Sequence, residues 1–206
     1  LKLQYCEVDG DVEKYKNAKA KYFIYERIWL MESRAESHYS ELMIQFTNSK
    51  STKTEVTELA KTYYAELEGF MGECSSFKLH LFGRMIQLTI FNSANDYRQT
   101  ATLCEEAIAF FDRKEYDSGL PLQVFYYNLV VCYLQLREFE KGQELISRCE
   151  YFFTEGTFNW YKLQELFFLL AMHSGHYTEA YHLYERVTGL PRFSDQAHQI
   201  VEMWKI

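Results

Sequence analysis

Apolar residues recur every three or four positions along nearly the whole chain, which is the spacing of one face of an α-helix. This pattern predicts one long helix, or two in near-continuity, from Asp11 to Phe46, and a further helix that ends near Met71. Between them, Thr52 and Glu55 have the spacing of a capping box, in which two side chains bond each other's backbone N–H groups at a helix start. The first seventy residues therefore indicate two long helices.

From about residue 75 onward, the predicted helices are shorter and come in pairs. Their expected bounds are Phe77–Asn92 with Tyr97–Arg113, Leu122–Leu136 with Glu138–Phe153, and Phe158–Ser174 with Tyr177–Thr188. Turn residues separate the pairs, and Pro191 and Ser194 mark the start of a fourth pair.

An aromatic residue opens the second helix of each pair. Tyr97, Phe139 and Tyr177 are 42 and 38 residues apart, and a period in this range is typical of a solenoid of helical hairpins. A two-helix hairpin cannot bury its apolar stripe alone, so each copy covers its neighbour. The sequence therefore predicts an all-α fold built from about three stacked hairpins.

Aromatic, branched and small residues also hold fixed places within the hairpins. These are Tyr126, Leu129, Tyr133, Phe139, Gly142, Ile146 and Cys149 in the middle pair, and Phe167, Ala171, Gly175, Tyr177, Ala180, Tyr184 and Val187 in the third. This order resembles the tetratricopeptide repeat (TPR). The first pair departs from it, since Thr100 takes the small-residue place and Arg84 and Gln87 fall where apolar residues are expected. The resemblance implies a right-handed TPR-like superhelix.

We expect residues 1–74 to form an N-terminal helical segment that packs on the repeats, and residues 75–206 to form the TPR-like repeats. The chain begins without Met, and its last residues, "SDQAHQIVEMWKI", follow a helical pattern to the end. For these two reasons we expect it to be a piece of a longer protein.

The net charge bears on the kind of partner, and the cysteines bear on the cellular compartment. A net charge of −7 argues against nucleic acid, because phosphate contacts need a basic face. The five cysteines form no C-x-x-C pair, so we expect reduced thiols in a cytoplasmic protein. The apolar run Gly119–Leu136 resembles a membrane span, but Pro121, Gln123, Asn128 and Gln135 interrupt it, which favours a buried helix.

No catalytic motif is present: the chain has no Gly-rich phosphate loop, no G-x-S-x-G, no H-E-x-x-H and no EF-hand pattern. The best metal candidate is His173, His176 and His182 with Glu179. Gly175 lies between the first two histidines at a helix end, so they need not share a face. We therefore predict a non-enzymatic protein without a metal or cofactor.

In the TPR family, the first helices of the hairpins line a concave groove that holds the ligand. The resemblance assigns to this groove Val124, Tyr127, Val131, Leu134 and Gln135 in the middle pair, Lys162, Glu165, Leu169, Met172 and His173 in the third, and Phe82, Met85, Thr89 and Asn92 in the divergent first. It implies a partner that is an extended peptide or a helix.

Two questions stay open at this point. The same apolar strip could instead be core, covered by the N-terminal helices. The function could be that of a protein–protein interaction scaffold or, alternatively, of a peptide-sensing regulatory domain within a larger transcriptional or signalling protein. An RNA-binding repeat is disfavoured by the acidic balance, and the oligomeric state is not predicted.

Overall fold

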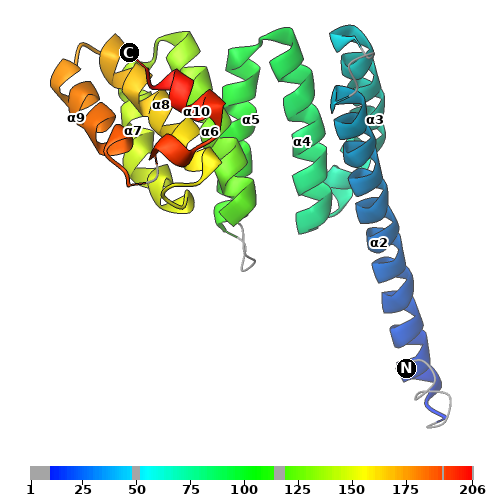
Figure 1. Cartoon of the computed structure of the whole chain (residues 1–206). Coiled ribbons are helices and arrows are strands. Elements are labelled where there is room, and N and C mark those ends of the chain that lie inside the picture. The colour runs from blue at the N-terminus through cyan, green and yellow to red at the C-terminus, as the bar shows by residue number, and fades with distance from the viewer. Residues whose placement is uncertain (1–9, 48–51, 114–118, 192, 206) are drawn as a thin grey trace. The chain divides into compact units, whose positions relative to one another are not determined.

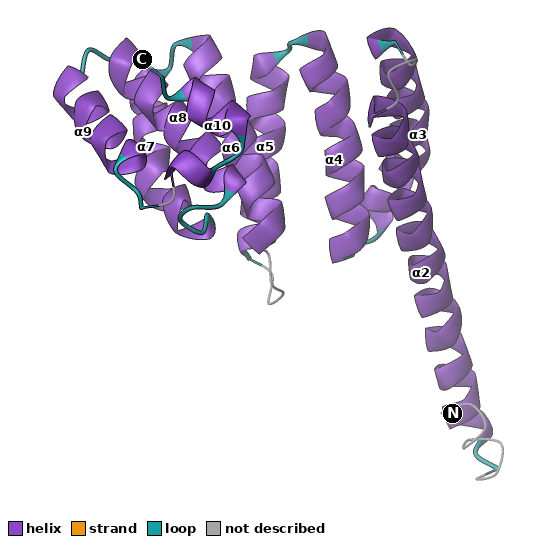
Figure 2. Ribbon diagram, in the orientation of Figure 1, coloured by secondary structure: helices purple, strands orange, loops and turns teal. Residues whose placement is uncertain are grey.

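The computed structural model describes residues 10–47, 52–113, 119–191 and 193–205, and all regular structure in these ranges is helical, without a strand (Figures 1 and 2). The all-α prediction is confirmed. The chain forms two compact units, Leu1–Ser93 and Ala94–Ile206. Each unit is described separately below.

The N-terminal unit is built from α2 (Val12–Thr47), α3 (Lys53–Glu73) and α4 (Phe77–Ala94). The long first segment is thus one unbroken helix. The predicted capping box at the start of α3 is confirmed, because the Thr52 hydroxyl accepts a hydrogen bond from Glu55 N at 3.2 Å and the Glu55 carboxylate accepts one from Thr52 N at 2.8 Å.

The core of this unit lies where the three helices meet. Its buried members are Met31, Ala35 and Leu42 of α2, Val56, Ala60 and Leu67 of α3, and Leu79 and Ile86 of α4. The apolar spacing noted in the sequence places these residues on facing sides of their helices.

Ion pairs and a ring contact flank this core. Arg27 of α2 pairs with Glu73 at the end of α3 at 2.6 Å, and Lys78 of α4 pairs with Glu36 of α2 at 3.3 Å. Phe82 of α4, which the family resemblance assigned to the groove, packs beside Tyr39 of α2 with ring centroids 5.6 Å apart. The long α2 therefore covers part of α4.

The C-terminal unit consists of shorter helices. They are α5 (Tyr97–Asp112), α6 (Gly119–Leu136), α7 (Phe139–Cys149), α8 (Phe158–His173), α9 (Tyr177–Thr188) and α10 (His198–Met203), with 3-10 turns at Glu150–Phe152 and Phe193–Asp195. The expected pairs α6/α7 and α8/α9 are both present. Two bounds in this unit differ from the prediction by more than one residue: α6 begins earlier, at Gly119, and α7 ends earlier, at Cys149.

The turns inside the pairs share one backbone geometry. Asn95, Arg137 and Gly175 have positive φ angles of 54°, 59° and 78°, and each stands two residues before an aromatic that begins α5, α7 or α9. In the two later turns, the N–H groups of Glu138 and His176 each donate to a carbonyl five residues earlier at 2.9 Å. Such bonds close a helix in the Schellman motif, so Phe139 and Tyr177 hold equivalent local positions.

Small and aromatic residues pack the helices of the C-terminal unit together. A Cβ atom added at Gly142 of α7 would lie only 2.7 Å from Leu170 Cδ2 of α8, so this position needs glycine for close helix approach. Phe125 of α6 stacks on Phe111 of α5, with centroids 5.7 Å apart.

The compact units divide after Ser93, whereas the sequence suggested a division between residues 74 and 75. The contacts of α4 with α2 place α4 in the N-terminal unit. The expected separation of an N-terminal segment from a repeat domain stays a prediction about domain organisation.

Candidate functional site

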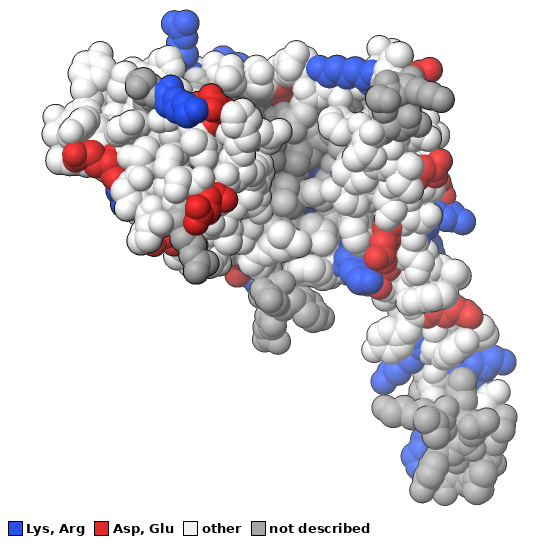
Figure 3. Space-filling model, in the orientation of Figure 1, with Lys and Arg blue, Asp and Glu red and all other residues white. Residues whose placement is uncertain are grey.

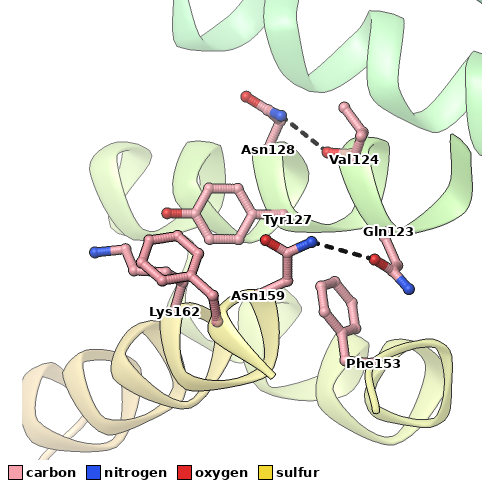
Figure 4. Close-up of a pocket in the computed structure, with 8 residues that line it drawn as sticks. Gln123, Val124, Tyr127, Asn128, Phe153, Asn159 and Lys162 are labelled. Carbon is pink, nitrogen blue, oxygen red and sulfur yellow. Dashed lines mark hydrogen bonds between the residues drawn. The ribbon is translucent and has the colours of Figure 1, made fainter. Parts of the chain in front are cut away.

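A pocket of about 260 Å³ lies between α6 and α8 in the C-terminal unit (Figure 4). It is lined by Gln123, Val124, Tyr127 and Asn128 of α6, by Phe153, and by Phe158, Asn159 and Lys162 of α8. Figure 4 shows side chains of α6 and α8 facing each other across it. This is a hollow with aromatic walls and several amide groups.

Helix periodicity explains why these residues meet. The four lining residues of α6 are spaced so that they share one face over two turns. The lining residues of α8 lie in its first turns, because Thr157 caps the helix by accepting a hydrogen bond from Trp160 N at 3.3 Å. Phe153 follows the 3-10 turn after α7 and is buried.

Amide hydrogen bonds hold the floor of the pocket. Gln123 Nε2 donates to the carbonyl of Phe152 at 2.6 Å, and Gln123 Oε1 accepts from Asn159 Nδ2 at 3.5 Å. The Asn128 side chain donates to the carbonyl of Val124 at 2.8 Å. The two bonds of Gln123 connect α6 with α8 and with the segment after α7, while that of Asn128 lies within α6.

One charged side chain lies at the pocket. Lys162 Nζ is 2.6 Å from the carboxylate of Glu165 and 3.3 Å from Met203 Sδ of α10. The positive charge is thus partly neutralised. Burial raises the pKa of Tyr127, an effect that the charge of Lys162 opposes, so its phenol is a neutral hydrogen-bond donor at physiological pH.

The lining residues of the pocket offer apolar contacts and hydrogen bonds. Among its lining residues there is no thiol, carboxylate or imidazole to act as nucleophile or general base. Its volume lies just below the range of typical small-molecule sites.

The structure brings together three of the residues that the resemblance assigned to the groove, namely Val124, Tyr127 and Lys162. Glu165 joins them through its ion pair. The others lie outside the pocket: Val131, Leu134 and Leu169 are half-buried, whereas Gln135, Met172 and His173 are exposed.

His173 contacts α7 and does not line the pocket. Its ring stacks on Phe139 of α7, with centroids 5.7 Å apart and planes 10° apart. Whether it and the other residues outside the pocket extend a binding strip stays a prediction.

Five lining residues were not predicted: Gln123, Asn128, Phe153, Phe158 and Asn159. A signal for two of them was present, because Gln123 and Asn128 are amides inside the apolar run that forms α6. A buried helix tolerates such groups where they find partners, and here they line a hollow.

The histidines weighed as a metal site have separate partners. His176 is 2.7 Å from Gln143 and 3.6 Å from Glu179, and His182 is 3.8 Å from Glu185. In the part of the chain that the structure describes, no three His, Cys, Asp or Glu side chains gather in a metal-binding cluster.

The described cysteines are free thiols, while Cys6 lies outside the described residues. Burial raises the pKa of both Cys132 and Cys149 to about 12. They are therefore protonated at neutral pH and poor nucleophiles. Within the same ranges, no helix combines the length and the apolarity needed to cross a bilayer.

A second hollow, of about 270 Å³, lies among α7, α8 and α9. Two charged residues on its wall, Glu150 and Arg186, pair with each other at 3.0 Å, and Arg186 also donates to the buried Gln164. The charged groups of this hollow are thus engaged within the unit.

No protein-family model matches this chain, and neither a curated protein nor a solved structure matches it. The likeness to the TPR family therefore depends on the residues quoted above.

Proposed function

We propose that this chain is a non-enzymatic, cytoplasmic scaffold for protein–protein interaction, and that its hairpins form a TPR-like superhelix. An extended peptide or a partner helix binds in a concave groove along α6 and α8. The observation that carries this proposal is the α6/α8 pocket, because it gathers Val124, Tyr127 and Lys162, which the resemblance assigned to the groove.

Two local features support repeat packing. The turns before α7 and α9 have the same hydrogen bonds, which is the behaviour of a repeated unit. Gly142 lies against Leu170 of the next hairpin, where the family has a small residue. Close approach at this point is what stacking of successive hairpins requires.

The lining residues suggest a binding mode. An apolar side chain of the partner inserts beside Tyr127 and Phe158, the second of which is 51% exposed at the pocket. The Asn159 side chain, whose carbonyl oxygen takes no part in its bond to Gln123, supplies a hydrogen bond to the partner's backbone. Affinity then comes from a few aromatic contacts, while the amide sets the direction of the peptide.

A peptide selection tests this proposal. Peptides are selected by display against the full chain, and the dissociation constant of the best one is measured for the wild type and for Tyr127→Ala combined with Leu134→Ala. We expect binding at least about tenfold weaker in the variant, since a central aromatic anchor contributes more than about 1.4 kcal/mol. Tyr181→Ala on α9, an exposed tyrosine of the same unit, is the matched control.

Unchanged affinity in the double variant with intact helicity would contradict the groove. Loss of helicity would show that Tyr127 and Leu134 are core residues. The regulatory alternative places its peptide in the same groove. The same variants therefore test peptide binding under that alternative as well.

A further inference from the structure

The N-terminal half of α2 exposes large apolar side chains. They are Tyr22, Phe23, Ile24, Tyr25, Trp29 and Leu30, each between 49% and 68% exposed. All buried residues of this helix, Met31, Ala35 and Leu42, lie in its second half. Because Glu73 at the end of α3 pairs with Arg27, the earlier residues of α2 extend past α3, as Figure 1 shows.

One side of this half carries an aromatic stripe, which we define as Tyr15, Ala18, Tyr22, Tyr25 and Trp29. These residues are three or four positions apart and so share one face of the helix. Further along α2, the same side of the helix carries polar residues. Ser33, Ser40 and Thr47 stand 18 residues, about five turns, after Tyr15, Tyr22 and Trp29. Aromatic residues are therefore confined to the part of this side that projects from the unit.

We propose that the aromatic stripe pairs antiparallel with the same stripe of a second copy of this chain. In an antiparallel pair, a step forward along one helix is a step back along the other. When Tyr22 lies opposite Tyr25 of the second copy, Trp29 lies opposite Ala18 of that copy. The largest ring of the stripe, Trp29, thus meets its smallest side chain, Ala18, while the two tyrosines between them meet each other.

A parallel pair does not have this complementarity. It places Trp29 against Trp29 and Ala18 against Ala18, so that one layer is overfilled and another is hollow. The order of large and small residues along the stripe therefore favours the antiparallel arrangement.

The charges beside the stripe match the same register. Lys19 and Glu26 lie on one flank, where the Tyr22 hydroxyl donates to Glu26 at 3.3 Å. In the antiparallel pair, Lys19 of each copy comes within reach of Glu26 of the other, and symmetry forms this ion pair twice. On the other flank, the aliphatic part of Lys21 covers Ile28 of the second copy.

The lysines near the stripe, Lys14, Lys16, Lys19 and Lys21, also suit an anionic surface. However, Glu13 and Glu26 stand among them, and Figure 3 shows both signs of charge along α2. A second copy satisfies both the order of sizes and the order of charges. Two such short segments bury an area at the low end of specific interfaces, so we expect a dissociation constant on the order of micromolar.

Sedimentation of the full chain over a range of concentrations tests the pairing. We expect a reversible monomer–dimer equilibrium. Trp29→Ala should weaken it at least about 30-fold, because in each of two symmetric layers the ring fills the gap at Ala18 of the other copy. Phe46→Ala is the matched control, since Phe46 is 66% exposed on the same helix but lies at its other end. This variant should dimerise like the wild type.

Charge reversal tests the register. Lys19→Glu alone and Glu26→Lys alone should each weaken the dimer several-fold, and the double variant should restore it. Circular dichroism checks that α2 stays helical. A chain that is monomeric at every concentration, or a dimer that Trp29→Ala leaves unchanged, would overturn the proposal.

Two further outcomes would also contradict it. A double variant as weak as the single ones would exclude the antiparallel register. Binding of the monomer to vesicles of anionic phospholipid, lost in Trp29→Ala, would assign the stripe to a membrane surface instead.

Discussion

The helices α2 and α6 use similar residues with opposite results. The 36 residues of α2 bury only Met31, Ala35 and Leu42, whereas the 18 residues of α6 bury eight side chains, among them Phe125 and Tyr133. Both helices present aromatic and aliphatic residues at helical spacing. The comparison teaches that spacing predicts where a helix forms, while the neighbouring elements decide whether its apolar side is core or surface.

The neighbours of α6 come from the same unit. Phe125 stacks on Phe111 of α5, and Tyr126 stacks on Phe152 after α7. The Tyr133 hydroxyl donates to Glu105 at 2.5 Å, and burial, followed by this bond, raises the pKa of Tyr133. These contacts cover α6 with residues from α5 and from the segment after α7. The first half of α2 has aromatic residues without such cover.

Truncation of one aromatic in each helix gives the largest expected contrast. Phe125→Ala should lower the free energy of unfolding by about 3–5 kcal/mol, because the ring is fully buried and leaves a cavity. Trp29→Ala, at a concentration where the chain is monomeric, should change it by less than about 0.5 kcal/mol, because Trp29 is exposed. Urea unfolding followed by circular dichroism measures both. Equal losses would remove the distinction between the two helices.

Glycine-to-alanine changes should have opposite effects on the free energy of unfolding in the two units. Gly142→Ala should destabilise the chain by about 1–3 kcal/mol, since the new methyl group would overlap Leu170. Gly69→Ala in α3 adds a methyl group with no atom within 4 Å and removes a poor helix former, so it should stabilise by about 0.5–1 kcal/mol. Thermal unfolding of both variants checks the two signs. A neutral Gly142→Ala would show that α7 and α8 are not in close contact.

The smallest expected effect is a pH dependence in the N-terminal unit. The hydrogen bond from His38 and the charge of Arg34 lower the pKa of Glu66 from its ordinary value of 4.5. A lowered carboxyl pKa stabilises the fold above the ordinary value, and this stability is lost as pH falls through the folded-state pKa.

Glu66→Gln should therefore cost less than about 1 kcal/mol at neutral pH, because the pair is solvent-exposed. The difference from the wild type should shrink as pH falls below 4.5. Unfolding measured in a series of buffers checks this. A difference that does not vary with pH would assign the loss to packing.

Local signals were enough to predict several helix starts. The capping box located α3, and the aromatic residue after each turn located α5, α7 and α9 at Tyr97, Phe139 and Tyr177. These signals depend on backbone groups and on neighbours close in sequence. For the same reason the hairpin pairs could be recognised before any contact between them was known.

The bounds that were wrong depend on tertiary contacts or on proline. Helix α6 begins at Gly119 because Pro121 is compatible with a first turn, where its missing N–H has no partner to lose. Helix α7 ends at Cys149, although apolar residues continue, because Phe152 stacks on Tyr126 and Phe153 is buried from a 3-10 turn. The spacing of apolar residues in the sequence does not show where α6 begins or where α7 ends.

Part of the pocket lies on one helix face. Val124 and Tyr127 share a side of α6, and the family resemblance had assigned them to one groove. Phe153, Phe158 and Asn159 come from a turn and from a helix start, and their approach to α6 depends on how the hairpins pack. That packing is a long-range property, which the spacing of residues in one sequence does not contain.

The most direct test of the claim that the α2 stripe is uncovered surface, ready for a second copy, uses the three tryptophans. Trp29 is 63% exposed, whereas Trp160 and Trp204 are 2% and 3% exposed. Fluorotryptophan is incorporated, the signals are assigned with single Trp→Phe variants, and the fluorine NMR shift between H₂O and D₂O is followed as the protein concentration rises. We predict a solvent shift for Trp29 alone in dilute solution, and its loss at high concentration. A Trp29 signal that is insensitive to solvent at the lowest concentration, or fully sensitive at the highest, would contradict the account.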